Sequence, residues 1–204
     1  MLLIKRNDMN ELIIDHNLIK KSSSELQTSL NKIVENYDES VKYFKRKIKC
    51  EYLEDKHFRE DIRDDDKFKE LFESLDEGAS TLYIFEMTSH HSTIEVKKRF
   101  TDYSKSSTRK RNVPSYIETT TESRILYVGK SQKGFWVRLI CHLGVGMKET
   151  WHGLQLLHWA KNINLELTLH IYQFNNGVMS NNLLRTMEKD LAEKLFPVIG
   201  MHNV

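Results

Sequence analysis

The chain has 204 residues, which is enough to bury one core of ordinary size. Its composition, 39% hydrophobic and 29% charged, is typical of a globular protein, and its 8 Gly and 2 Pro argue against long disordered linkers. The formal net charge is +2, but basic residues gather after residue 80, which favours phosphate-bearing partners. No apolar run approaches the length of a membrane span, so no membrane partner is expected. Cys50 and Cys141 are far apart and fit reduced thiols in a cytoplasmic protein.

The first part of the chain, residues 1–78, is predicted to be a helical region. Apolar residues recur at helical spacing over residues 26–48, and a second helical pattern covers residues 51–75. No motif in this region indicates a catalytic reaction, so its expected role is recognition, dimerisation or packing. The turn at residues 76–78 marks the boundary with a second domain over residues 79–204.

The second domain is predicted to contain three strands. Residues 81–87 and 124–130 are short apolar runs, and residues 164–174 alternate strictly between apolar and polar side chains. Gly129 interrupts the second run where the backbone must turn or come close to another group. This part of the chain therefore combines strands with helices.

Two helices carry the chemically informative side chains. In the helix that starts after Gly134, Arg138 and His142 are four residues apart and therefore neighbours on one side. In the last helix, Glu188 lies along the apolar stripe between Leu184 and Leu191. A carboxylate facing a core is costly unless it is paired or bound to a metal. The alternative is a structural ion pair, or a stripe edge that reaches solvent.

The connection between the first two strands, residues 88–123, is long, polar and basic in its centre. A connection of this length is uncommon unless it is functional or mobile. It suits the binding of a phosphate backbone, and the alternative is a solvated loop. The basic residues predicted to contact nucleic acid, with one from the second strand, are Lys97, Lys98, Arg99, Lys105, Arg109, Lys110, Arg111 and Lys130.

Taken in order, these motifs resemble the GIY-YIG nuclease family over about residues 80–204. Thr81-Leu82-Tyr83 would be the first short motif and Tyr127-Val128-Gly129 the second. Two features depart from the family pattern: Leu82 replaces a glycine, and the gap between the two tyrosines is much longer than the usual hairpin. The remaining positions that match are the helix arginine, the histidine one turn later, the metal-binding glutamate and the closing asparagine, here Arg138, His142, Glu188 and Asn203.

The resemblance implies an α+β fold, a small antiparallel three-stranded sheet flanked by helices, and a catalytic site. Tyr83 would be the general base, Tyr127 would position water or phosphate, and Arg138 would donate to the phosphate. Glu188 would hold Mg²⁺, or Mn²⁺, which prefers few protein oxygens and several waters. His142 would assist proton transfer, with His152 as a further candidate nearby.

The function expected from this resemblance is a metal-dependent DNA endonuclease of a restriction or defence system. RNA remains an alternative substrate, and a homo-oligomer is expected if both strands are cut together. The alternative function is a nucleic-acid-binding or protein-interaction module with weak or no catalysis on the same scaffold.

Overall fold

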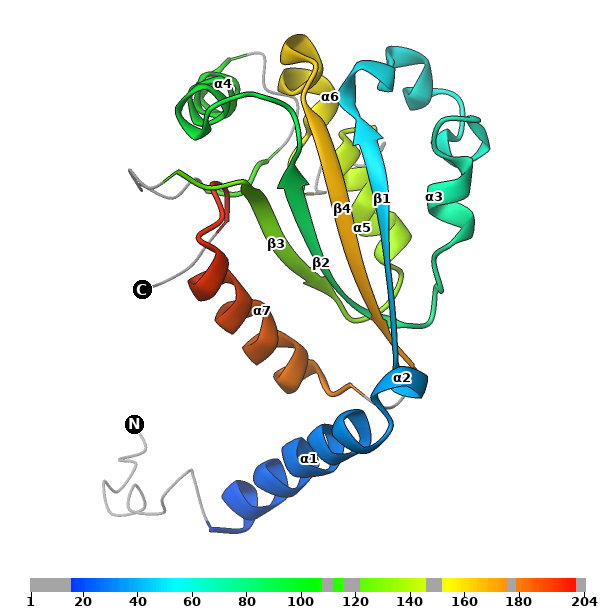
Figure 1. Cartoon of the computed structure of the whole chain (residues 1–204), viewed down its shortest axis with the longest axis vertical. Coiled ribbons are helices and arrows are strands. Elements are labelled where there is room, and N and C mark those ends of the chain that lie inside the picture. The colour runs from blue at the N-terminus through cyan, green and yellow to red at the C-terminus, as the bar shows by residue number, and fades with distance from the viewer. Residues whose placement is uncertain (1–15, 108–111, 116–121, 146–151, 176–178, 201–204) are drawn as a thin grey trace, which may run out of the picture.

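Figure 1 shows the computed structural model of the chain, in which helices surround a single sheet. The structure describes residues 16–107, 112–115, 122–145, 152–175 and 179–200. Within these ranges no helix has the length and apolar character that crossing a membrane requires.

The sheet has four antiparallel strands in the order β1-β4-β2-β3. The mixed α and β class and the antiparallel pairing agree with expectation, but the predicted number of three strands is wrong. The additional strand is β1, which forms an edge of the sheet and pairs only with β4. The strands are β1 (Val41–Lys49), β2 (Ser80–Met87), β3 (Ile125–Ser131) and β4 (Glu166–Phe174).

Strand β1 lies where the sequence predicted the end of a long helix. The helical pattern holds through α1 (His16–Glu35) and the short α2 (Tyr37–Ser40), and then the chain becomes extended. Phe44 and Ile48 are four residues apart, a spacing that places both on one side of either a helix or a strand. The nine-residue ladder with β4 decides between the two, because tertiary pairing overrides local propensity.

The helix predicted over residues 51–75 is also wrong for most of its length. The segment forms three 3₁₀ turns, η1 (Cys50–Tyr52), η2 (Asp55–Phe58) and η3 (Ile62–Asp64), and one five-residue helix, α3 (Lys69–Glu73). Asp61 and Asp65 end the regular pattern, because their carboxylates accept hydrogen bonds from backbone N–H groups two residues later.

The main core lies on one face of the sheet, called the inner face here. Helices α5 (Phe135–Leu143) and α6 (Leu156–Trp159) pack there, as do side chains from α3 and α4 (Thr93–Lys105). Leu53 and Phe68 share this core with Phe85 and Leu169. Side chains from before and after residue 78 therefore form one hydrophobic cluster.

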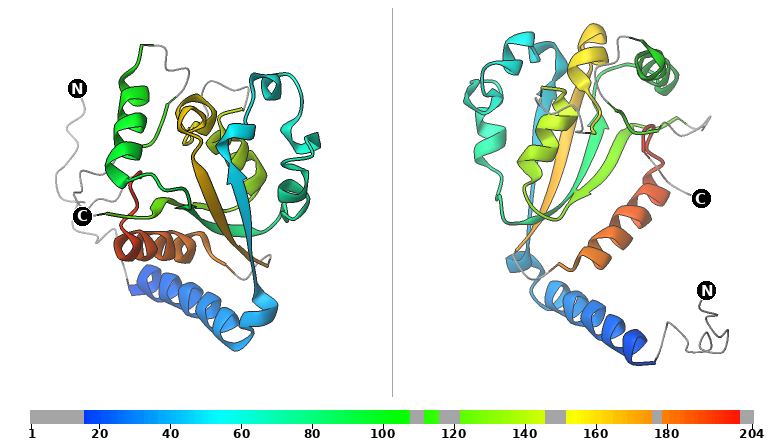
Figure 2. Two further views of the ribbon diagram at one scale, coloured as in Figure 1. Left: turned by 45° about the horizontal axis from the view of Figure 1, so that its top comes forward. Right: turned by 180° about the vertical axis from the view of Figure 1, so that it is seen from behind.

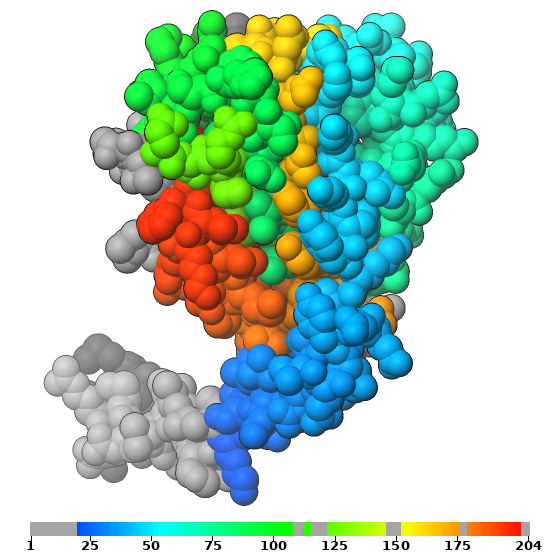
Figure 3. Space-filling view, in the orientation of Figure 1, coloured from blue at the N-terminus to red at the C-terminus, as the bar shows by residue number. Residues whose placement is uncertain are grey.

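The opposite face, called the outer face, is only partly covered. Helix α7 (Asn181–Leu195) crosses it beside β3 and β2, and α1 runs below it, as both views in Figure 2 show. The space-filling view shows β1 and the upper part of β4 at the surface, beyond the reach of α7 (Figure 3). The inner face of the sheet is thus buried under packed side chains, and the outer face is partly exposed to solvent.

The long connection after β2 contains α4, which the sequence did not predict. Ser92 caps this helix by accepting a hydrogen bond from the Glu95 N–H. Val96 and Phe100 anchor it in the main core, and its other side carries charged residues to solvent.

Candidate functional site

The candidate site forms around the edge strand β3, where α5 on the inner face and α7 on the outer face come together. Tyr83 on β2 and Tyr127 on β3 both point to the inner face, with ring centroids 6.2 Å apart. In the ladder, Tyr83 lies directly opposite Gly129. A Cβ atom at Gly129 would lie 2.5 Å from Tyr127 Cε1 and 2.6 Å from Tyr83 Cζ. Only glycine leaves room for the two phenols to come together over this strand.

Helix α5 brings an arginine and a histidine to the two phenols. The turn before it places Gly134 in the left-handed region, at φ 62°, and the helix ends at Gly144, at φ 88°. His142 Nε2 lies 2.9 Å from the Tyr83 hydroxyl, and Arg138 Nε lies 3.4 Å from the same oxygen. Arg138 also donates from Nη1 to the carbonyl of His152 at 2.6 Å, which holds the guanidinium against the loop before α6.

The hydrogen bonds in this cluster have a defined direction. The backbone N–H of Leu154 donates to His142 Nδ1 at 3.2 Å, so a neutral His142 carries its proton on Nε2. Nε2–H then donates to the Tyr83 oxygen, and Arg138 Nε donates to the same oxygen. Arg138 and the Tyr83 hydroxyl both favour the charged form of Tyr127.

Burial controls the protonation of these three groups. It raises the pKa of Tyr83 well above the usual value and lowers the pKa of His142 well below it, the latter with help from Arg138. Both groups are therefore neutral at physiological pH. Burial also raises the pKa of Tyr127, but Arg138 and the Tyr83 hydroxyl oppose the effect. Tyr127 is 8% exposed while Tyr83 is fully buried, so Tyr127 is the phenol nearer to the surface.

Glu188 approaches the same place from α7. Its carboxylate interacts electrostatically with Lys130, Arg138 and Arg185. Burial raises the pKa of Glu188, and these three cations oppose that shift. The half-buried Glu188 carboxylate makes no ion pair within 4.0 Å in the described part of the chain. Its oxygens are therefore available as ligands for a cation.

A hard cation fits Glu188 as one carboxylate ligand, with waters and phosphate oxygens as the others. The described residues include no cluster of three or more His, Cys, Asp or Glu side chains that could hold a metal without other ligands. Magnesium commonly binds with one or two carboxylates and substrate phosphates, so the donor set agrees with that mode.

The other predicted residues divide into three groups. Lys97, Lys98, Arg99 and Lys105 lie on α4, where Lys98 pairs with Asp102 at 2.9 Å. The His152 side chain is exposed and only its carbonyl reaches Arg138. Arg109, Lys110, Arg111 and Asn203 lie outside the described residues.

No family model, curated protein or solved structure matches this chain. What defines the site is therefore its geometry. One feature of that geometry had no counterpart in the sequence pattern: the Leu154 N–H that fixes the His142 tautomer. It is a backbone donor, which carries no residue signature.

Proposed function

We propose that this protein is a magnesium-dependent endonuclease that hydrolyses phosphodiester bonds in DNA. The observation that carries the proposal is the placement of Tyr127, Arg138 and Glu188 on β3 and on the two helices beside this edge strand, α5 and α7, where the three groups interact electrostatically. Phosphodiester hydrolysis needs an activated water, relief of negative charge on the phosphate and assistance to the leaving oxygen. A phenol, a guanidinium and a cation-binding carboxylate are suited to these tasks.

The lower burial of Tyr127 supports this residue, rather than Tyr83, as the general base. Once it has lost its own proton to solvent, Tyr127 takes a proton from the water that attacks phosphorus. Burial raises the pKa of this phenol, and Arg138 and the Tyr83 hydroxyl oppose that rise by stabilising the negative charge. Tyr83 and His142 are positioning residues, because both are neutral and fully buried. Their role is to orient the hydroxyl that supports Tyr127.

Arg138 and Glu188 act on the phosphate. Arg138 donates to the phosphate oxygens as negative charge builds up at phosphorus. Glu188 would hold a Mg²⁺ ion, which would supply Lewis-acid stabilisation of the phosphate and a lowered pKa for nearby water. Exposed basic residues on α4 and Lys130 on β3 contact the DNA backbone and set its register.

The proposed setting is a restriction or defence nuclease in the cytoplasm, with a homo-oligomer cutting both strands. Cys50 and Cys141 are both buried and form no disulfide in the described part of the chain, which is compatible with a reducing compartment.

The test is cleavage of supercoiled plasmid DNA in Mg²⁺ and, separately, in EDTA. Glu188→Ala is expected to lower the rate at least about 100-fold, as loss of a group that stabilises charge in the transition state does. Glu193→Ala is the matched control, because Glu193 lies on the same helix in an exposed pair with Lys189. Tyr127→Phe is expected to lower the rate more than Tyr83→Phe, since only the former removes the proton acceptor.

The competing results are also distinct. DNA binding by the parent protein without any cleavage would instead indicate a binding module on this scaffold. Faster cleavage of RNA than of DNA at matched salt would identify RNA as the substrate.

A further inference from the structure

The open half of the outer face presents stacked aromatic rings to solvent. Tyr43 on β1 lies directly opposite Tyr172 on β4, with ring centroids 4.7 Å apart and an interplanar angle of 28°. Tyr43 is nevertheless 49% exposed. Its hydroxyl lies 2.9 Å from His170 Nδ1, and His170 Nε2 lies 2.8 Å from Glu86 Oε2. These contacts fix the rings in place, while the ring surface that faces solvent stays open.

Basic side chains border the rings on the same face. Strand β1 carries five Lys and Arg residues and no acid. Lys45 lies directly opposite His170 in the ladder, and Lys47 lies opposite Thr168, so both are on the face that carries Tyr43. Both lysines are exposed, and neither has a carboxylate within ion-pair distance among the described residues. On the same face Glu166 pairs with Lys49 and Glu86 pairs with His170, so Lys45 and Lys47 keep their positive charges for a partner.

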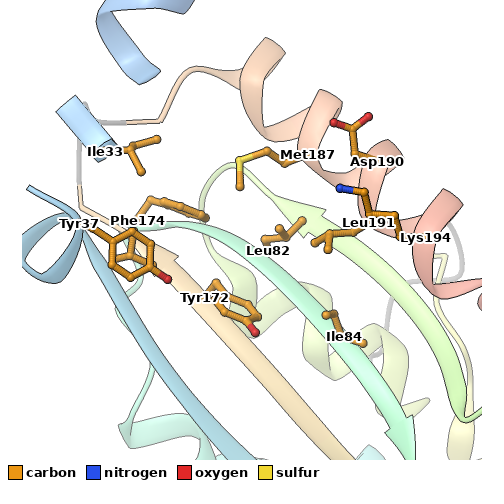
Figure 4. A pocket seen from close by; sticks show the side chains of 11 residues that line it. Ile33, Tyr37, Leu82, Ile84, Tyr172, Phe174, Met187, Asp190, Leu191 and Lys194 are labelled. Carbon is orange, nitrogen blue, oxygen red and sulfur yellow. The ribbon is translucent and has the colours of Figure 1, made fainter. Parts of the chain in front are cut away.

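An apolar cavity of about 370 Å³ begins at the other side of Tyr172. It lies between α7, the end of α1 and the outer face of the sheet, and Figure 4 shows the side chains that surround it. Tyr172 and Phe174 form its floor with Leu82, and Met187 and Leu191 from α7 face them. The aromatic surface therefore continues from the open sheet into a hollow with room for a planar ring.

We propose that this open outer face, with Tyr43, Tyr172, Lys45 and Lys47, binds single-stranded DNA. Unpaired bases stack on exposed aromatic side chains, while lysines follow the phosphate backbone. A duplex hides the flat surfaces of its bases, so it can use the lysines but not the rings. The choice of DNA over RNA rests on the proposed function, whereas the stacking surface itself does not.

This surface is separate from the candidate nuclease site. Tyr83 and Arg138 serve the inner side of the sheet, and Tyr43 lies on the outer face of the opposite edge strand. A single strand held there is therefore a second nucleic-acid contact of the same chain.

The test is fluorescence anisotropy of a labelled oligo(dT) of about 12 nucleotides in EDTA, a length within the range that single-strand binding surfaces cover. Tyr43→Ala is expected to raise Kd about tenfold, and Tyr43→Phe is expected to bind like the parent, because stacking needs the ring and not the hydroxyl. Lys45→Gln with Lys47→Gln is expected to reduce the slope of log K against log salt by about 1.4, for two phosphate contacts on a single strand.

Matched controls come from exposed residues elsewhere on the chain. Tyr52→Ala replaces another exposed tyrosine, and Lys69→Gln with Lys189→Gln replaces two exposed lysines on α3 and α7. Thermal melts by circular dichroism identify any variant that is unfolded, and the lysine variants, at exposed positions, keep the test decisive if Tyr43→Ala fails to fold.

Equal affinity of Tyr43→Ala and Tyr52→Ala, no measurable binding of oligo(dT), or tighter binding of matched duplex would each overturn the proposal. Tighter binding of oligo(rU) would overturn the choice of DNA. Because binding is measured without Mg²⁺, its failure leaves the nuclease proposal standing, and a failure to cleave plasmid leaves this one standing.

Discussion

The two faces of the sheet carry the same pair of side chains in opposite surroundings. On the inner face the Tyr83 hydroxyl lies 2.9 Å from a histidine nitrogen, and on the outer face the Tyr43 hydroxyl does so at the same distance. Tyr83 and His142 are fully buried, whereas Tyr43 is 49% exposed. Water replaces a broken hydrogen bond on the outer face but not on the inner one. The two Tyr–His hydrogen bonds have equal lengths, but they are therefore expected to contribute unequally to the free energy of unfolding and to the electrostatics of the protein.

The largest expected effect comes from filling the space between the Tyr83 and Tyr127 rings on the inner face. Gly129→Ala places a methyl group within 2.6 Å of both tyrosine rings, and we expect it to lower the free energy of unfolding by about 3 kcal/mol through overpacking. Urea denaturation measures the change. Gly134→Ala is the control, because its nearest contact would be 3.9 Å away and only the left-handed backbone is strained, at about 1 kcal/mol. A similar loss for both variants would show that the phenols move apart easily.

The second prediction compares substitutions of His142 and His170. His142→Leu leaves the buried Leu154 N–H without its acceptor and removes one of the two donors to the Tyr83 oxygen, and we expect a loss of about 2 kcal/mol in the free energy of unfolding. His170→Leu removes two hydrogen bonds on the outer face, to Tyr43 and Glu86, where water replaces the lost partners and losses stay within about 0.5 kcal/mol. Both variants are measured by urea denaturation at neutral pH. Equal losses would mean that burial does not distinguish the two faces.

The smallest effect is a difference in pH dependence. The folded protein depresses the pKa of His142 well below its usual 6.5, so the unfolded chain binds more protons there when the pH falls below that value. His142 thus stabilises the fold fully above about pH 6.5, and this stability is lost as the pH falls toward the folded pKa, by up to about 1.4 kcal/mol per pH unit. Denaturation from pH 7.5 to 5 compares the parent with His142→Leu, whose curve is expected to be flatter. Parallel curves would contradict a buried neutral histidine.

The second half of the fold could be predicted from the sequence because its signals were local. The alternation in residues 164–174 corresponds to β4, and Ser180 caps α7 by accepting from the Leu183 N–H. Strand β1 could not be predicted, because Phe44 and Ile48 fit both a helix and a strand. Only pairing with a segment more than 100 residues away resolves the ambiguity.

The candidate site shows a similar division. The side chains that meet there could be named from motif order and from the carboxylate in an apolar stripe. Their roles could not, since the direction of the hydrogen bonds depends on a backbone N–H at Leu154. The assignment of the base to Tyr83 followed the resemblance alone, and no sequence pattern could show that the two phenols differ in burial.

The strand order has a consequence for how the chain acquires its shape. Strand β4 lies between β1 and β2, and its residues leave the ribosome more than 100 residues after β1. Strands β2 and β3 can pair earlier, while the lysine-rich β1 waits without a partner until the last quarter of the protein has been synthesised. Mutual repulsion between its positive charges then keeps neighbouring copies from pairing through this strand, both during synthesis and after folding.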